Sequence, residues 1–292
     1  MNAFTIKDLE NLSGIKAHTI RIWEQRYNFL KPQRTTTNIR YYSNDELKTI
    51  LNIALLNKYG FKISHIDRMD HQEMQQRILS LGDPKAIQER IINELVQEIV
   101  DMNMERFEKV LNNYIASRGI ERTVTQIIFP FLEKIGILWL TGHINPAQEH
   151  LVTNIIRQKL IVAIEGTISH ISMDKTFLLF LPEGEHHELG LLYMYYLLKN
   201  RGAKTIYLGA NVPVKDVEYV INAKKPDIIF IHLTATASNF NFEKFLTNVQ
   251  LRFGQVKTII SGQLTQHYKK RIPPNVEFKK SLGEFMEFIS SI

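Results

Sequence analysis

Hydrophobic positions repeat with two different periods along this chain of 292 residues. Through residue 168 they recur every three or four positions, as in Ile6, Leu9 and Leu12, which predicts amphipathic helices. The last third instead contains short apolar runs separated by segments of helical pattern. Runs of this kind predict buried parallel strands joined by crossover helices, as in a doubly wound, Rossmann-like sheet. The four runs are residues 176–181, 204–209, 227–233 and 257–261.

The first quarter of the chain is typical of a winged helix-turn-helix module. Thr5 is a predicted N-cap, and the turn residues 13–15 separate two short helices, an arrangement that places the second helix in a major groove. A polar tip at residues 35–38 predicts a hairpin wing, and Ser43 caps a further helix that runs to about Lys58. The side chains expected to contact double-stranded DNA are Lys16, His18, Thr19, Arg21, Arg26, Tyr27, Arg34, Arg40 and Tyr41.

The charge distribution agrees with a polyanion-binding N-terminus. The net charge is +6, and residues 1–70 hold eleven Lys and Arg against seven Asp and Glu, so this quarter carries four of the six excess charges. Clustered positive charge of this kind favours nucleic acid as a partner.

The middle of the chain, residues 84–168, contains helical pattern only. Four helices with short connections predict a bundle, with a kink at Pro130 in the third. Trp139 lies near the end of that helix, and Glu149 and His150 begin the next one. By pattern alone, Trp139 is a core residue, and Glu149 is an acid that meets the positive end of a helix dipole.

The segment Glu185-x-His187-x-x-Gly190 follows the first apolar run and precedes a helix. A His on such a loop reaches the crevice at the strand ends, where α/β sheets bind ligands. A nearby carboxylate can hold its second ring nitrogen, and the Gly lets a large ligand approach the backbone. Taken alone, the pair His186-His187 is also consistent with two solvated surface residues. A third interpretation is a zinc site formed together with Glu185 or Glu188.

Several classes of protein and site are disfavoured by composition. The chain has no cysteine, and it lacks the glycine motif of dinucleotide-binding sites. Its first residues do not resemble a signal peptide, and no run of about eighteen apolar residues predicts a membrane span. We therefore expect a cytoplasmic protein without a membrane partner.

Residues 3–70 resemble the MerR family of transcription regulators. The resemblance rests on the run from Arg21 to Tyr27, followed by Pro32, Arg34 and the run from Arg40 to Ser43. The amino-acid sequence of the first run is similar to that of the cobalamin-linked, light-responsive branch of that family. Asn38 stands where the wing usually has Gly, and Asn tolerates the left-handed backbone that this turn needs.

The middle, with Trp139, Glu149 and His150, resembles the helical cap of that cobalamin-binding branch, and the last third resembles the cobalamin-binding domain shared by corrinoid-dependent methyltransferases, mutases and regulators. The resemblance implies that Trp139 covers the upper corrin face, that Glu149 and His150 line the pocket of the upper axial group, and that His187 ligates cobalt. Leu140 follows Trp139 where the light-sensing members have a His, so capture of a photoproduct by two histidines is not expected. Leu140 cannot ligate a metal.

Further departures concern the lower half of the predicted cofactor site. Glu185 replaces the usual Asp, so its hydrogen bond to His187 is expected to be re-angled or lost. His232 and Gln263 replace small residues that make room for the nucleotide tail of cobalamin. The resemblance implies that these side chains fill the tail slot, unless the slot is rebuilt with other polar contacts.

Together these patterns predict a multidomain α and α/β protein. We expect a winged helix-turn-helix domain at residues 1–75, a four-helix cap at 80–170 and a cobalamin-binding-like sheet at 174–292. The leading hypothesis is a DNA-binding regulator, dimeric or tetrameric, that binds cobalamin as its sensory ligand. In the alternative, the pocket is degenerate and another ligand or a protein partner, such as an antagonist, controls the regulator. An enzyme is disfavoured, because no substrate barrel fits in the remaining length.

Overall fold

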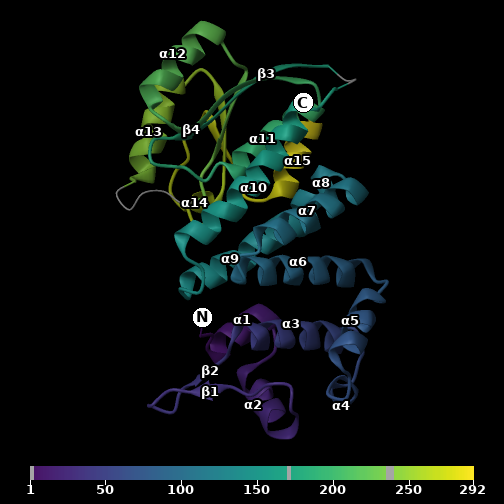
Figure 1. Cartoon of the computed structure of the whole chain (residues 1–292). Coiled ribbons are helices and arrows are strands. Elements are labelled where there is room, and N and C mark those ends of the chain that lie inside the picture. Colours follow the sequence, from purple (N-terminus) through teal and green to yellow (C-terminus); the bar gives the residue numbers. More distant parts are fainter. Residues whose placement is uncertain (1–2, 170–171, 235–239) are drawn as a thin grey trace. The chain divides into compact units, whose positions relative to one another are not determined.

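Residues 3–156 form the first of two structural units, and residues 157–292 form the second. The computed structural model describes residues 3–169, 172–234 and 240–292. The first unit is helical except for one small hairpin, whereas the second contains a five-stranded sheet (Figure 1). The helix α10 (Pro146–Glu165) crosses the division between the units.

The first unit starts with the predicted helix-turn-helix. Thr5 forms a capping box with Asp8 at the start of the first helix, and Gly14 ends that helix in the left-handed conformation, with φ of 76°. The hairpin tip also follows the prediction, because Asn38 adopts φ of 64°. The elements are α1 (Ile6–Ser13), α2 (Ala17–Arg26), β1 (Gln33–Arg34), β2 (Arg40–Tyr41), α3 (Asn44–Lys58), α4 (Ile63–Ile66) and α5 (His71–Leu79).

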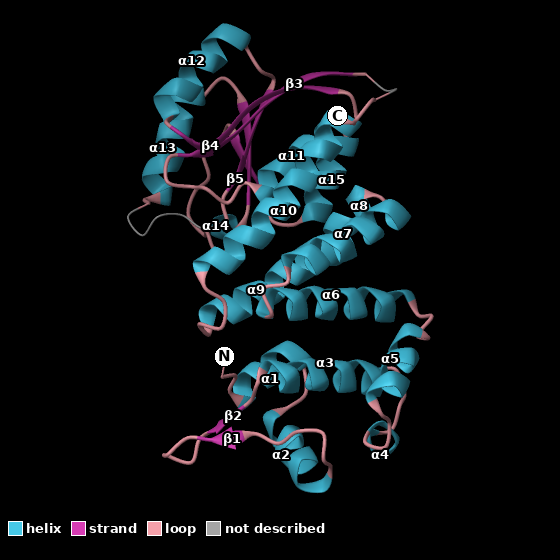
Figure 2. Ribbon diagram, viewed as in Figure 1, coloured by secondary structure: helices cyan, strands magenta, loops and turns pink. Residues whose placement is uncertain are grey.

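The helices of the predicted bundle follow in the first unit. They are α6 (Pro84–Val100), α7 (Met104–Arg118), α8 (Ile120–Thr123) and α9 (Phe129–Leu140), followed by the start of α10 (Figure 2). A π-helical turn, η1 (Val124–Ile128), lies just before Phe129 and Pro130, where the sequence predicts a kink. A proline cannot donate the usual helical hydrogen bond and its ring crowds the preceding turn, so the wider turn relieves both problems.

The continuous helical stretch Ile120–Leu140 is long and apolar enough to cross a membrane by length and composition alone. One such helix is weak evidence for a span, since core helices pass the same test. Here Phe131, Ile135 and Leu138 are buried among the other helices of the unit. A buried face of this kind is what a core helix of a bundle requires.

The second unit is the predicted doubly wound sheet, with all strands parallel in the order β4-β3-β5-β6-β7. The four apolar runs correspond to the first four strands, whereas β7, which is short and half charged, was not predicted. The elements are β3 (Met173–Pro182), α11 (Leu189–Asn200), β4 (Ala203–Val212), α12 (Val214–Lys224), β5 (Ile228–His232), α13 (Phe242–Phe253), β6 (Lys257–Ser261), α14 (Gln263–Gln266), β7 (Val276–Lys279) and α15 (Leu282–Ser290).

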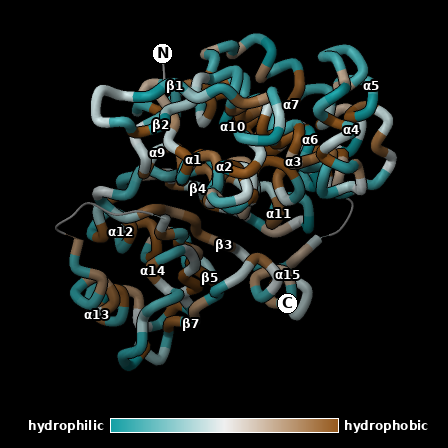
Figure 3. Tube along the Cα trace, turned by 90° about the horizontal axis from the view of Figure 1, so that it is seen from below, coloured by the Kyte–Doolittle hydropathy of each residue, from teal (hydrophilic) through white to brown (hydrophobic). Residues whose placement is uncertain are grey.

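Helices cover both faces of this sheet. Figure 1 shows α12 and α13 on one side and α11 and α15 on the other. Phe180 packs on Phe253 of α13, whereas Phe230 packs on Phe285 of α15. Helices with one buried face, such as α13, show alternating brown and teal segments in the hydropathy colouring of Figure 3. The next two strands in the sequence, β4 and β5, lie on opposite sides of β3. The carboxyl end of β3 is therefore the topological switch point, where sheets of this kind bind ligands.

Candidate functional site

The loop after β3 holds a tightly bonded carboxylate–imidazole pair. Glu185 is completely buried, and its Oε1 accepts hydrogen bonds from the backbone N of His187 at 2.9 Å and from the ring Nδ1 at 2.7 Å. Its Oε2 accepts one from the backbone N of Thr234 at 3.0 Å. Of the two outcomes expected for Glu in place of Asp, loss of the bond is wrong, since the longer side chain keeps it.

This bonding determines which ring nitrogen of His187 suits a metal. A carboxylate only accepts hydrogen bonds, so the Nδ1 bonded to Glu185 carries a proton. A metal would then bind at Nε2, with Glu185 fixing the tautomer and the ring orientation. The side chain of His187 is 51% exposed, so it is accessible to a large ligand.

The donor set around His187 suits a metal that needs one protein ligand. Among the described residues, no three His, Asp or Glu side chains gather as a metal site, so nothing there supports zinc at His186-His187. The cobalt of a corrin would require one nitrogen ligand from the protein. His187 with its orienting acid fits this requirement.

A second network, which sequence reasoning missed, lies next to this pair. Glu188 accepts a hydrogen bond from Tyr207 Oη at 2.7 Å. It also forms an ion pair with Arg157, whose Nη2 lies 2.8 Å away. Burial, and then the bond to Glu188, raise the pKa of the Tyr207 hydroxyl well above its usual range. The network connects α10, the loop of His187 and β4. Tyr207 and Arg157 lie 19 and 31 positions from Glu188 in the sequence, so no local pattern indicated them.

The ring of His232 fills the space beside Gly190. A Cβ atom on residue 190 would lie 2.4 Å from Cδ2 and 2.5 Å from Nε2 of the His232 ring. His232 Nδ1 lies 2.8 Å from Ser261 Oγ, and burial lowers the pKa of His232 to about 4, so the ring is neutral at pH 7. Any group that enters this space requires the His232 ring to move.

Gln263 does not close the cleft in the same way, because it is exposed at the start of α14. The glycine before it is needed for the backbone. Gly262 has φ of 103°, and a Cβ there would lie 2.2 Å from the carbonyl oxygen of Leu233. A side chain at position 262 would therefore displace the loop after β5.

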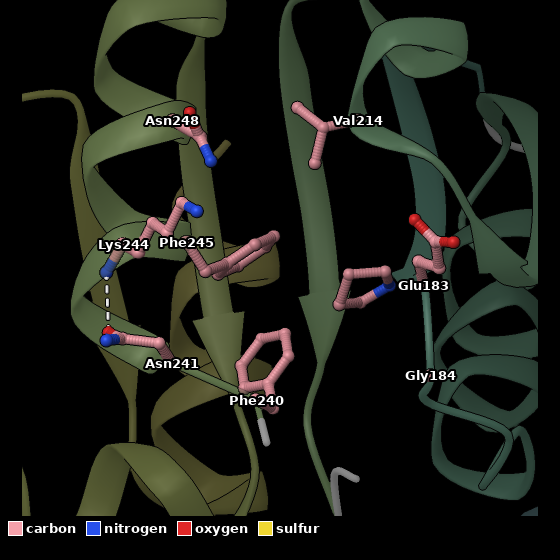
Figure 4. Close-up of a pocket in the computed structure, with 9 residues that line it drawn as sticks. Glu183, Gly184, Val214, Phe240, Asn241, Lys244, Phe245 and Asn248 are labelled. Carbon is pink, nitrogen blue, oxygen red and sulfur yellow. Dashed lines mark hydrogen bonds between the residues drawn. The ribbon is translucent and has the colours of Figure 1, made fainter.

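A separate hollow of about 430 Å³ lies near the start of α12 and α13. Figure 4 shows Glu183, Val214 and Phe240 around it, with Asn241 bonded to the backbone of Lys244. The Asn241 contact caps α13, so it serves the helix itself.

In the first unit, the predicted cap residues lie on either side of one short connection. Trp139 is in the last turn of α9, and Glu149 and His150 are in the first turns of α10. Trp139 is 51% exposed, an unusual state for a large aromatic side chain and different from the core position that pattern alone predicted. Leu140 is 81% exposed. Exposed apolar side chains at this position suit a planar ligand better than they suit water.

The predicted DNA-contacting residues lie on the recognition helix and the hairpin. His18, Arg21 and Arg26 are exposed on α2, with Thr19 and Tyr27 partly buried near them, and Lys16 is the N-cap residue. Arg34 of the wing is exposed and bonds Asn38 Oδ1 at 2.8 Å, and Tyr41 bonds Gln33.

Glu24 is a residue of this interface that sequence reasoning missed. It accepts a hydrogen bond from Arg40 Nε at 2.9 Å and another from the hydroxyl of Tyr42. Burial, and then the bond to Glu24, raise the pKa of Tyr42. Glu24 therefore connects the recognition helix to the wing and fixes the orientation of Arg40.

Comparison with known proteins agrees with this geometry. Residues 4–73 match the MerR HTH family of regulatory proteins, and residues 91–163 and 176–275 each match a B12 binding domain. Two proteins of Myxococcus xanthus are similar over most of the chain. The HTH-type transcriptional repressor CarH is 26% identical over 253 residues, which are 85% of this chain and 84% of CarH. The repressor CarA is 24% identical over 269 residues, which are 91% of this chain and 89% of CarA.

Among solved structures, the monomethylamine corrinoid protein of Methanosarcina barkeri is similar, with a TM-score of 0.54 and 14% identity. The match covers 69% of this chain and 97% of that protein. At this identity the likeness concerns the fold, and it agrees with the order of helices and parallel strands described above.

Proposed function

We propose that this homologue of the CarH and CarA repressors, which joins a MerR-type helix-turn-helix domain to two B12-binding domains, is a transcription regulator that binds cobalamin as its sensory ligand. The observation that carries the proposal is the Glu185–His187 pair at the carboxyl end of β3. A DNA-binding end and a ligand-binding end in one chain allow a ligand to bias two states of the protein.

The residues assigned to the cofactor come from both units. His187 would ligate cobalt through Nε2, with Gly190 close by, and Glu185 would hold the opposite ring nitrogen. Trp139 would cover the upper corrin face, and Glu149 and His150 would line the pocket above it. When bound, cobalamin supplies a cobalt ion whose upper axial group can be exchanged or lost.

The cofactor assignment is tested by the visible spectrum of the purified protein after incubation with adenosylcobalamin and gel filtration. We expect a coloured protein peak with an imidazole-ligated spectrum, which His187→Ala removes. The matched control is His186→Ala, because His186 is the exposed neighbour on the same loop and should leave the spectrum unchanged. A colourless wild-type peak would contradict the cofactor assignment.

The alternative function is a regulator whose pocket admits no cobalamin and responds to another ligand or to a protein partner such as an antagonist. The position of His232 against Gly190 favours it. The variant His232→Ser separates the two ideas, because it empties the space beside Gly190. If the pocket is degenerate only because of this ring, the variant becomes coloured while the wild-type protein stays colourless.

The partner at the other end is double-stranded DNA, with the contacts assigned above to α2 and the wing. We propose a dimer or tetramer, since one recognition helix reads too few bases and paired half-sites need two. The probe is a duplex selected from a random pool by the full-length protein. We expect its affinity to fall steeply with added salt and to drop roughly tenfold in Arg21→Ala. Arg118→Ala, an exposed Arg on α7, is the control, and salt-independent binding would contradict the proposal.

The chain acts as a regulator and not as an enzyme, and it works in the cytoplasm, where its DNA lies. Light responsiveness through two histidines is not proposed, because Leu140 occupies the position after Trp139. No membrane partner is proposed either, since the apolar helix Ile120–Leu140 packs inside the first unit.

A further inference from the structure

The connection between α9 and α10 is bonded directly to the helix-turn-helix. His143, in this connection, lies with Nε2 at 2.8 Å from Oδ2 of Asp8 in α1. The side chains of His143 and Asp8 are 11% and 5% exposed, so the pair is shielded from water. The His143 ring also packs on Phe4, with 4.4 Å between ring centroids. All of these residues belong to the first unit.

Asp8 is the acid of the capping box that starts α1. The same Oδ2 accepts hydrogen bonds from the backbone N of Thr5 at 2.7 Å and from its Oγ1 at 2.6 Å. Burial raises the pKa of Asp8, but the bonds from Thr5 and His143 together outweigh it and lower the pKa below the usual value. The ionised Asp8 only accepts, so the Nε2 of His143 carries the proton that joins the two segments.

The opposite end of α1 is held by the same part of the bundle. Lys134 of α9 donates a hydrogen bond from Nζ to the carbonyl oxygen of Leu12 at 3.2 Å and another to Asn93 Oδ1 at 2.8 Å. A cation at the end of a helix satisfies carbonyl groups that the helix leaves without partners and complements its dipole. Both ends of α1 therefore depend on α9 and the connection that follows it.

Direct contacts continue from α1 to the DNA-reading elements. The backbones of Phe4 and Tyr42 exchange two hydrogen bonds, at 2.9 and 2.8 Å. Tyr42 directly follows the wing residues Arg40 and Tyr41, and its hydroxyl bonds Glu24 of the recognition helix. A displacement of His143 would thus move Phe4, and through Phe4 it would move Tyr42, which connects the wing to Glu24 of the recognition helix.

We propose that His143 couples the cobalamin site to the DNA-binding surface, a proposal that rests on the function proposed above. Trp139 precedes the connection 141–145 by two positions, and Glu149 and His150 follow it by four and five. A ligand that orders these flanking side chains constrains both ends of the connection, and His143 passes that constraint to α1 and the wing. Coupling of this kind is reciprocal, so DNA must also change the affinity for cobalamin by the same factor.

The first test uses the full-length protein without cofactor or DNA. Hydrogen–deuterium exchange of the α1 amides should be roughly tenfold faster in His143→Ala, because a buried charge-assisted bond to the capping acid is lost. His143→Phe keeps the ring contact with Phe4 and should show the same acceleration if the bond to Asp8 is what matters. His71→Ala, an exposed His at the start of α5, is the control. Unchanged exchange in both His143 variants would overturn the proposal.

The second test measures coupling itself, as the ratio of affinities for the selected duplex with and without adenosylcobalamin. We expect a ratio of at least fivefold in the wild-type protein and in His71→Ala, and a ratio near one in His143→Ala and His143→Phe. If the His143 variants keep the wild-type ratio, or if the wild-type ratio is one, the coupling proposal fails while the proposed function stands. A wild-type protein that binds neither cobalamin nor DNA would overturn the proposed function and the coupling together.

Discussion

One buried carboxylate organises the loop after β3. The two oxygens of Glu185 accept three hydrogen bonds, two from His187 and one from the backbone of Thr234, on a different strand connection. A carboxylate suits this position because every partner is a donor. An amide of the same shape would place an NH₂ group against one of those donors.

Glu185→Gln should therefore loosen the loop without changing its volume. We expect the amides of His187 and Thr234 to exchange with solvent roughly tenfold faster, as expected when a buried donor loses its acceptor. The measurement is hydrogen–deuterium exchange of the full-length protein. Glu183→Gln, an exposed residue two positions earlier, should leave both amides as they are; equal exchange in the two variants would contradict the argument.

His232 makes the second unit sensitive to acid. Its pKa is lowered to about 4 by burial, whereas in the unfolded chain it stays near 6.5. Between those values the unfolded state binds the proton more tightly, so folding stability falls as the pH falls. Relative to His232→Ala, the wild-type protein should lose on the order of 3 kcal/mol between pH 7 and pH 4. Urea unfolding followed by far-ultraviolet circular dichroism at each pH checks this, and parallel pH profiles of the two proteins would contradict it.

Among the elements, α1 shows how a short helix depends on its neighbours. Its eight residues are too few for a stable isolated helix, so its ends matter. One end has the local capping box, and the other has the ammonium group of Lys134, which comes from α9. The bundle therefore supplies what the sequence of α1 itself lacks.

Lys134 should also give the first unit a characteristic pH profile. Burial lowers the pKa of Lys134 to about 8, and the unfolded chain has a value near 10.4. The unfolded state thus binds the proton more tightly, so stability should rise between pH 8 and pH 10 in the wild-type protein relative to Lys134→Met, by on the order of 2 kcal/mol. Both tryptophans, Trp23 and Trp139, lie in the first unit, so tryptophan fluorescence during urea unfolding reports on this unit. A constant difference between the two proteins across this range would contradict the assignment.

At the scale of the whole molecule, the proposed ligand contacts are divided between the units. Trp139, Glu149 and His150 belong to the first, and Glu185, His187 and Gly190 belong to the second. A ligand that contacted only one unit would order only one of them.

Adenosylcobalamin should therefore slow exchange in two separate regions, residues 139–150 and residues 185–190. The physical reason is that a ligand bound to the native state suppresses the local openings of every segment that it contacts. Hydrogen–deuterium exchange with and without the cofactor is the measurement. In His187→Ala the protection should decrease in both regions, and a region without protection in the wild-type protein would contradict the assignment of its residues to the cofactor.

Local patterns predicted those parts of the fold whose cause is local. Thr5 and Ser43 cap helices as expected, because a capping box needs only four neighbouring residues. The strands β3 to β6 were predicted because each is a nearly continuous apolar run. β7 was missed because its four residues include Glu277 and Lys279, and the sheet accepts them at its edge.

The candidate site was predictable to the same degree. Glu185 and His187 are two residues apart, so a carboxylate that orients the imidazole could be predicted from the sequence. That the hydrogen bond persists with Glu in place of Asp could not be predicted. The contact of His143 with Asp8 joins positions 135 residues apart, and that of His232 with Gly190 depends on the way two strands are placed. Such contacts follow from tertiary packing, which no local spacing encodes.

The two anchors of α1 have a practical consequence for exchanging parts between regulators. A DNA-reading head cut off near residue 75 would keep all its groove-facing side chains but lose the partners at both ends of its first helix. Fused to a different sensor domain, this head would have a less stable first helix and would bind DNA more weakly, unless the new domain supplied equivalents of Asn93, Lys134 and His143. The transferable unit is thus the head together with the bundle that supports it.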